Sequence, residues 1–288
     1  MYPVLEISRH VNLAGFSQAL RRKRIPHRIV EQGEKQVVLI HTRDAAEVRA
    51  LFEQHQAGSL EVPEIEPQID PTFALLTRDI LLAPFIVTLL VANVLIHWLT
   101  GGLASLSPDS FSGSLTLVEF LRIGGRVIFS DVGHTLASGQ YWRLFTPMLL
   151  HGGLLHLVFN LLWVWEVGRR IERLHGGLFI FGMVMATSLA ANLTQYLMYG
   201  PSLFGGMSGV VYGLFGFAVV WRALVPTRDI GFPPQLYVAV ILFMMLGFTD
   251  MFSRWGLHLA NGAHLGGFIC GCLLGVMTAF TVTFRRNS

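Results

Sequence analysis

The stretch Gly205-Gly206-Met207-Ser208-Gly209-Val210-Val211-Tyr212-Gly213 contains no charged residue, and its glycines recur at every fourth position. That spacing places them in a smooth stripe along one face of a helix. The same spacing of small residues occurs again at Ala263, Gly267, Gly271 and Gly275. Stripes of small residues allow helix backbones to approach closely in a membrane. The sequence therefore predicts that these two helices pack against each other.

A polar residue stands beside each stripe. Ser208 directly precedes Gly209, and His264 directly follows Ala263. If the stripes pack together, these two side chains can meet at hydrogen-bond distance. A hydroxyl and an imidazole are costly in lipid, so polar groups at this depth usually face a cavity and serve a function. Tyr212 lies four residues after Ser208, on the same helix face, and could pack on the imidazole.

Serine and histidine are the minimal pair for nucleophilic catalysis, because one attacks while the other removes its proton. The sequence thus indicates a proteolytic site inside the membrane, with Ser208 as nucleophile and His264 as general base. Each residue alone has a plainer interpretation, since a serine among glycines is usually a packing residue and a buried histidine is usually structural. Their matched positions beside the two stripes favour the catalytic interpretation.

The composition supports a membrane setting. Of the 288 residues, 52% are apolar and only 14% are charged, whereas a soluble domain carries about 25% charge. The net charge of +3 is too small to suggest nucleic acid as a partner of a membrane protein. Cys270 and Cys272 are two apart in an apolar helix, so a disulfide between them is geometrically unfavourable.

Residues 1–60 differ from the rest of the chain and are predicted to form a small cytoplasmic α+β unit of order β-α-β-β-α. Residues 61–75 are acidic and rich in proline, and we expect a linker there. No cleavable signal peptide is expected, because the chain begins with a polar segment. The predicted strands are Val4–Ile7, Arg28–Glu31 and Gln36–Ile40, and the predicted helices are Phe16–Arg24 and Ala45–His55.

Uncharged stretches mark the membrane spans, since one bilayer crossing needs about 20 apolar residues. The stretch between Arg173 and Arg222 is long enough for two crossings, broken at Tyr199-Gly200-Pro201-Ser202. Residues 80–99, 144–165, 230–249 and 255–284 hold one crossing each. The sequence thus predicts an all-α membrane domain of six transmembrane helices over residues 76–288.

Arginines set the orientation of these spans. Arginines concentrate in the short connections that would face the cytoplasm if the N-terminal unit lies there. An even number of spans then places both termini in the cytoplasm. Ser208 and His264 would both lie toward the outer face.

The second span carries further polar groups. His156 and Asn160 are four residues apart and share a helix face. Acyl transfer creates an oxyanion, which an amide NH₂ and an imidazole N–H can stabilise. One alternative is a hydrogen-bonded pair that joins helices. Another is a zinc site of His151, His156 and His264, which the lack of an H-E-x-x-H motif and of a nearby carboxylate disfavours.

Other polar residues suit structural roles. Glu172 lies among Arg169, Arg170 and Arg173 and is predicted to be an ion-paired helix cap. Trp142 and Arg143 end the long first loop, where they would anchor to headgroups or brace the loop. Asp250 and Trp255 flank the end of the fifth span in a similar way.

Four motifs in this chain resemble those of the rhomboid family of intramembrane serine proteases. They are Trp142-Arg143, His156-xxx-Asn160, Gly206-Met207-Ser208-Gly209 and Asn261-Gly262-Ala263-His264. The resemblance extends from the linker to the C-terminus. The N-terminal unit is similar to the cytoplasmic domain of bacterial members of the family.

This resemblance implies a six-helix rhomboid bundle with a water-filled active site open to the periplasm. Ser208 would be the nucleophile and His264 the base, without a third carboxylate. His156, Asn160 and the backbone N–H groups of Ser208 and Met207 would form the oxyanion hole.

The resemblance also implies supporting residues. Tyr212 would orient His264, and Gly206, Gly209 and His151 would support the site. Trp142, Arg143, Glu172 and Gly267 would have structural roles.

The partners implied by the resemblance are the lipid bilayer of a bacterial inner membrane and single-span membrane proteins, which are cut near the outer end of their helix. The fifth span and the loop Asp250–Leu259 would move aside as a lateral gate. No cofactor or metal is implied. Pro147 stands where some relatives carry a histidine, and we expect this to affect only cavity polarity or stability.

Two other functions compete with proteolysis. An inactive rhomboid relative that binds membrane proteins for quality control would typically lack the serine or the histidine, and both are present here. A solute transporter would often show inverted repeats, and the sequence shows no internal repeat.

Overall fold

The computed structural model describes residues 2–41, 44–60, 78–249, 251–252, 254 and 259–287, with side chains described as far as Val282. The chain divides into two compact units, Met1–Ala74 and Leu75–Ser288. Asp250, Trp255 and most of the predicted gate loop lie outside the described residues, as does the whole of the predicted linker.

The first unit is a small three-stranded sheet with two helices. Its elements are β1 (Tyr2–Ser8), α1 (Ala14–Arg22), β2 (His27–Gln32), β3 (Lys35–Ile40) and α2 (Ala45–Gln56). The sheet is antiparallel with β3 in the centre. The predicted order of strands and helices is confirmed.

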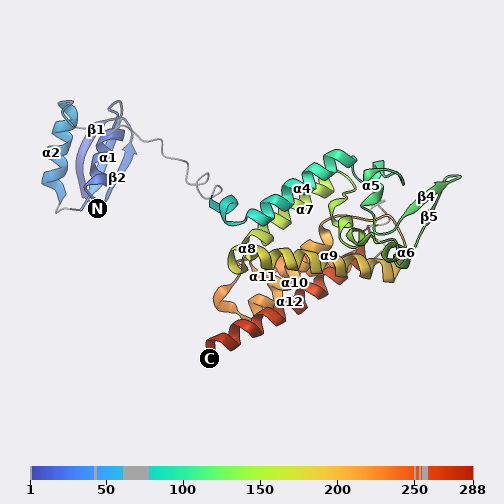
Figure 1. The fold of residues 1–288 in the computed structure, drawn as a ribbon. Helices are drawn as coiled ribbons and strands as arrows, with labels where there is room; N and C mark the ends of the chain where they lie inside the picture. The colour runs from blue at the N-terminus through green and yellow to red at the C-terminus, as the bar shows by residue number, and fades with distance from the viewer. Residues whose placement is uncertain are drawn as a thin grey trace. The chain divides into compact units, whose positions relative to one another are not determined.

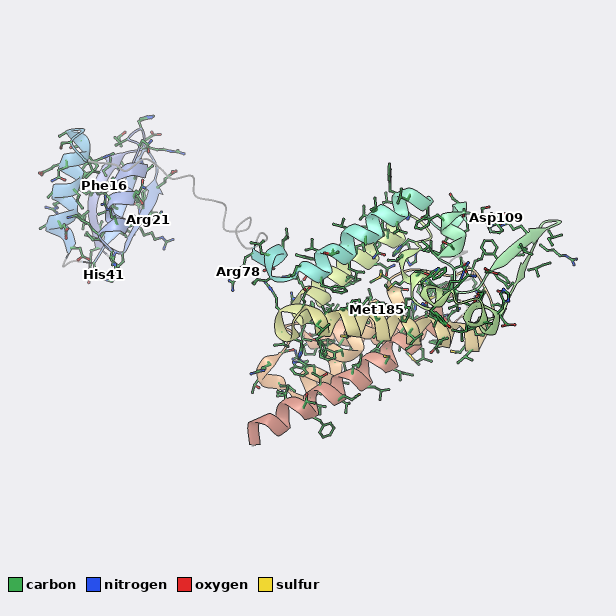
Figure 2. All side chains as sticks on the ribbon, viewed as in Figure 1. Phe16, Arg21, His41, Arg78, Asp109 and Met185 are labelled. Carbon is green, nitrogen blue, oxygen red and sulfur yellow. The ribbon has the colours of Figure 1, made fainter. Side chains whose placement is uncertain are left out.

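An apolar core joins the helices of this unit to its sheet. Phe16 of α1, labelled in Figure 2, is fully buried. Its ring meets that of Phe52 of α2 edge-on, with the centroids 5.3 Å apart. Val38 and Ile40 of the central strand are also fully buried. All members of this core come from the first unit.

The second unit is helical (Figure 1). Its helices are α4 (Pro84–Thr100), α7 (Leu154–Trp163), α8 (Arg169–His175), α9 (Gly177–Tyr199), α10 (Ser208–Leu224), α11 (Pro234–Gly247) and α12 (Asn261–Asn287). A π-helical turn, η5 (Val164–Gly168), joins α7 to α8. A 3₁₀ turn, η6 (Pro226–Arg228), follows α10.

The long first loop of this unit has structure of its own. It contains η2 (Leu103–Ser105), α5 (Phe111–Ser114), the hairpin of β4 (Phe120–Ile123) and β5 (Arg126–Phe129), α6 (Val132–Ala137), and the 3₁₀ turns η3 (Tyr141–Leu144) and η4 (Thr146–Leu149). The hairpin projects at the end of the bundle opposite to the C-terminus (Figure 1).

Helix length gives partial support for the predicted spans. Among the described residues, α9 and the portion Asn261–Val282 of α12 have the length and apolar composition needed to cross a membrane. The apolar helices α4, α10 and α11 are shorter. A helical membrane unit is therefore supported, and the count of six crossings stays a prediction.

The two stripes of small residues lie against each other, because α10 packs along α12. A methyl group on Gly267 would overlap the carbonyl oxygen of Gly209, and one on Gly271 would overlap that of Gly213. Gly205 departs from the expected stripe, since it lies before α10 and packs on the first loop. Gly216 extends the contact instead, next to the carbonyl of Phe268.

Glu172 caps a helix, but among the described residues it has no ion pair, contrary to the prediction. It is buried, and its two carboxylate oxygens accept the backbone N–H groups of Phe85 and Ile86, each at 2.9 Å. The first N–H groups of a helix have no intrahelical acceptor, and a negative charge there is favourable. Glu172 thus caps the start of α4. In the described chain the nearby arginines pair with Glu166 and Asp79 instead.

Trp142 and Arg143 brace the first loop. The Arg143 side chain is buried and donates to the carbonyls of Gly113 at 2.8 Å and Thr116 at 3.0 Å. The indole of Trp142 donates to the carbonyl of Ser114 at 3.0 Å. Of the two predicted roles, the contacts support bracing, because a buried guanidinium cannot reach lipid headgroups.

Candidate active site

Ser208 and His264 lie together at the seam between α10 and α12. Ser208 is the first residue of α10, and His264 lies in the first turn of α12. The Nε2 atom of His264 is 2.9 Å from the Oγ atom of Ser208. The glycine seam allows this approach, because no side chain separates the two backbones.

Tyr212 covers one face of the imidazole. It lies one turn after Ser208, and its ring centroid is 4.6 Å from that of His264 with the planes 34° apart. Within the described residues no carboxylate hydrogen-bonds to His264. The imidazole is therefore oriented by a ring contact and by the backbone of α12.

Two side-chain donors of α7, His156 and Asn160, lie beside Gly206. The Nδ1 atom of His156 accepts the N–H of Gly152 at 3.2 Å, which places the imidazole proton on Nε2. The Nδ2 atom of Asn160 is buried and has no partner in the described part of the chain. A buried donor without a partner is costly, which suggests that it serves a ligand or a reacting atom.

Gly206 makes room for these donors. Its φ of 124° lies in a region that side chains rarely adopt. A Cβ atom there would lie 2.7 Å from Cε1 of His156 and 3.5 Å from Nδ2 of Asn160. Only glycine therefore fits between α7 and the start of α10.

The backbone of Met207 differs from its predicted role in the oxyanion hole. Its N–H donates to Nε2 of His151 at 3.3 Å, so this donor already has an acceptor. His151 is fully buried and holds the loop before Ser208. The N–H of Ser208 begins α10 and has no acceptor among the described residues, as expected of a first helical residue.

A small cavity borders Ser208. Its volume is about 10 Å³, roughly what one water molecule needs. Ser188 and Asn192 of α9 form part of its wall, together with Gly206. Two polar side chains of α9 therefore line the space beside the serine, among residues that are mostly apolar or glycine.

Comparison with known proteins explains this arrangement. The sequence pattern of the rhomboid domain matches residues 138–280, and that of the rhomboid N-terminal domain matches residues 2–65. The chain is 30% identical over 248 residues to the rhomboid protease GlpG of Photorhabdus laumondii. The aligned region covers 86% of this chain and 78% of that protein. This chain belongs to the rhomboid family.

Membership of the rhomboid family has direct consequences. It supports an intramembrane serine protease function and identifies a bacterial membrane protein. Rhomboid proteases act on membrane-protein substrates within the bilayer. All the predicted site residues of this rhomboid, from Trp142 to Gly267, lie inside the matched domain.

A row of polar residues on α9 was not among the site residues predicted from the sequence. Ser188 donates to the carbonyl of Phe145 at 3.1 Å, and Asn192 donates to that of Leu144 at 2.8 Å. Both side chains are buried. They connect α9 to the end of the first loop of this rhomboid.

Gln195 continues this row toward α12. Its Oε1 atom accepts the N–H of Ala263 at 3.1 Å, directly before His264. Ser188, Asn192 and Gln195 are spaced by four and three residues in a helix without charge, which was the available signal. Their partners lie far away in the sequence, so the spacing alone could not name them.

The histidines of the alternative zinc site are otherwise engaged. Nε2 of His151 faces the Met207 N–H, Nδ1 of His156 faces the Gly152 N–H, and Nε2 of His264 faces Ser208. Across the described ranges, no three His, Cys, Asp or Glu side chains are grouped as a metal site.

Proposed function

We propose that this rhomboid is a serine endopeptidase that cleaves transmembrane segments of single-span membrane proteins with a Ser208–His264 dyad. The contact of 2.9 Å between the hydroxyl and the imidazole carries this proposal. It is the distance at which a general base can remove the proton of a nucleophile.

Acylation begins at the serine. The Oγ atom of Ser208 attacks the carbonyl carbon of the scissile peptide bond, and its proton moves to Nε2 of His264. The C–N bond then breaks, and the imidazolium gives that proton to the leaving amine. An acyl-enzyme remains on Ser208. Water then attacks it with the same histidine as base, which releases the acid and restores the hydroxyl.

The oxyanion that forms at each attack needs donors in place. In this proposal they are the Nδ2 of Asn160, which has no partner among the described residues, the Nε2–H of His156 and the N–H of Ser208. The start of α10 adds the favourable field of a helix N-terminus. We assign Met207 no donor role in this hole, since its amide serves His151.

We further propose six membrane crossings with both termini in the cytoplasm of a bacterial inner membrane. The connections with Arg169, Arg170, Arg173 and Arg222 would face the cytoplasm. The start of α10 and the first loop would face the periplasm. Residues 1–60 would form a cytoplasmic domain, residues 61–75 a linker and residues 76–288 the protease unit.

The test uses purified protein in detergent with a tagged single-span substrate. Cleavage should be lost in Ser208→Ala and in His264→Ala, and a fluorophosphonate should label the native protein but not Ser208→Ala. Ser202→Ala is the matched control, because within the described part of the chain its hydroxyl donates only to the nearby Gly200 carbonyl. Product that persists in both dyad variants would refute the proposal, and loss on chelation with recovery on zinc addition would favour a metal site.

The rival function is an inactive relative that binds membrane proteins. It is not favoured, because the serine and the histidine are both present and in contact. Binding of the substrate without labelling of Ser208 in the native protein would support that rival.

A further inference from the structure

The end of the first loop supports the loop that leads into Ser208. The carbonyl of Pro147, in η4, accepts the N–H of Gly206 at 3.0 Å. Gly205 packs closely on the carbonyls of Pro147 and Leu150. The position of Gly206 beside the α7 donors therefore depends on the position of η4.

Proline at position 147 leaves a gap in the hydrogen bonding of this segment. In a 3₁₀ turn each N–H donates to the carbonyl three residues earlier. Pro147 is the second residue of η4, and extending the turn back by one residue would need an N–H at position 147 that donates to Leu144, which proline lacks. The next pair is intact, since the N–H of Met148 donates to the carbonyl of Phe145 at 3.3 Å. The carbonyl of Leu144 thus lacks its local donor.

Asn192 of α9 fills this gap. Its Nδ2 atom donates to the carbonyl of Leu144 at 2.8 Å, and its side chain is buried. An unpaired backbone carbonyl within a membrane protein is costly. Ser188, one turn earlier, adds a donor to the carbonyl of Phe145, which already has the N–H of Met148.

We propose that Asn192 is a positioning residue for the oxyanion loop, because it replaces the donor that Pro147 lacks. The proposal rests on the proposed function and extends it. Asn192 and Ser188 of α9 hold the carbonyls of Leu144 and Phe145 at the start of η4, and the carbonyl of Pro147 in η4 in turn holds the N–H of Gly206. Asn192 itself would touch neither the scissile bond nor the dyad.

The test is a double-mutant cycle between Asn192→Leu and Pro147→Ala. With Pro147 present, Asn192→Leu should lower kcat and the rate of fluorophosphonate labelling roughly tenfold, with little change in KM, because a buried acceptor is left unpaired. An alanine at position 147 restores a local N–H for Leu144. In that background, Asn192→Leu should cost less than roughly threefold.

Two further variants make the test sharper. Ser188→Ala should cost less than Asn192→Leu, because the carbonyl of Phe145 keeps the N–H of Met148. Thr187→Val is the matched control on the same helix, since its buried hydroxyl donates, among the residues described, only to the carbonyls of Met183 and Val184 in α9. It should keep native activity.

Several outcomes would overturn the positioning role. Equal losses for Asn192→Leu in both backgrounds would show that Asn192 does not serve the gap left by Pro147. A loss in Ser188→Ala as large as that in Asn192→Leu would do the same. Melting temperatures of the four cycle members give a readout that needs no activity, and they should show the same coupling. A native protein that neither cleaves nor labels would instead refute the proposed function.

Discussion

At the scale of single residues, the polar groups near Ser208 differ in whether they already have partners. His151 and His156 hold the backbone amides of Met207 and Gly152. The Nδ2 atom of Asn160 has no partner in the described chain. A donor without a hydrogen-bond partner in the resting fold is available to bind the oxyanion in the transition state. Asn160 differs from its neighbours in this respect.

We therefore expect opposite effects of Asn160→Leu on activity and on stability. The value of kcat/KM should fall about 10²–10³-fold, as when one oxyanion donor is removed. The melting temperature should stay the same or rise, because an unpaired buried amide is lost. Cleavage assays and thermal unfolding in detergent measure both quantities.

Asn93→Leu provides the comparison for this variant. Asn93 is fully buried in α4 and donates only to the carbonyl of Leu89 at 2.9 Å. Its replacement should leave cleavage intact. A fall in melting temperature for Asn160→Leu together with unchanged cleavage would contradict the assigned role.

At the scale of elements, the seam between α10 and α12 brings the dyad together. Gly209 and Gly213 face Gly267 and Gly271 across it, so the two backbones touch directly. Any side chain added here would separate Ser208 from His264. The seam thus contributes to stability and to the site geometry at once.

Gly267→Ala should therefore reduce both the stability of the protein and its proteolytic activity. The new methyl group meets the rigid carbonyl of Gly209, so we expect destabilisation of about 3 kcal/mol, at the upper end for overpacking. Cleavage should be lost as well. Gly182→Ala in α9 is the control, since nothing lies within 4 Å of its added Cβ, and it should stabilise by roughly 0.5–1 kcal/mol. Equal melting temperatures for the two variants would count against the seam.

A second element-scale prediction concerns the first loop, outside the membrane. The side-chain amide of Gln140, at 2.6 Å, and then Arg143 and His134 hold the pKa of Glu119 below its ordinary value of 4.5. A lowered folded-state pKa gives stability that is present above the unfolded pKa and is lost as the pH falls through the folded pKa. The melting temperature of the native protein should thus fall as the pH drops below 4.5.

Glu119→Gln should remove that part of the acid sensitivity. Melting temperatures at neutral pH and at about pH 3, which lies below the ordinary carboxyl pKa range, measure the difference. Asp109→Asn is the control, because Asp109 (labelled in Figure 2) is an exposed carboxylate of the same loop without an ion pair among the described residues. An identical acid response in native protein and Glu119→Gln would refute the role of this carboxylate.

At the scale of the whole molecule, the two units have separate cores. One apolar core is built from the first unit alone, and the largest core of the second unit from that unit alone. Neither needs the other to bury its apolar side chains. The site residues all come from the second unit.

Removal of residues 1–70 should therefore leave the membrane unit folded and active. The truncated protein should insert into the membrane, label with a fluorophosphonate and cleave the same substrate, because no residue of its core is lost. Labelling and cleavage of the truncated and the full-length protein measure this. Loss of all turnover in a truncated protein that still inserts would mean that the first unit takes part in activity.

The sequence by itself determined the features that depend on local spacing. The four-residue repeats of glycine predicted the seam, and they placed Ser208 and His264 beside it. The spacing of His156 and Asn160 put them on one face of α7. The order of elements in the first unit followed from alternating polar and apolar residues.

Only the tertiary structure decided which distant groups pair. Glu172 caps α4 and not its own helix, Met207 donates to His151, and Asn192 serves Leu144. Each of these hydrogen bonds joins segments far apart in the chain. Helical periodicity reveals which face a polar side chain occupies, but its partner depends on how the helices are arranged in space.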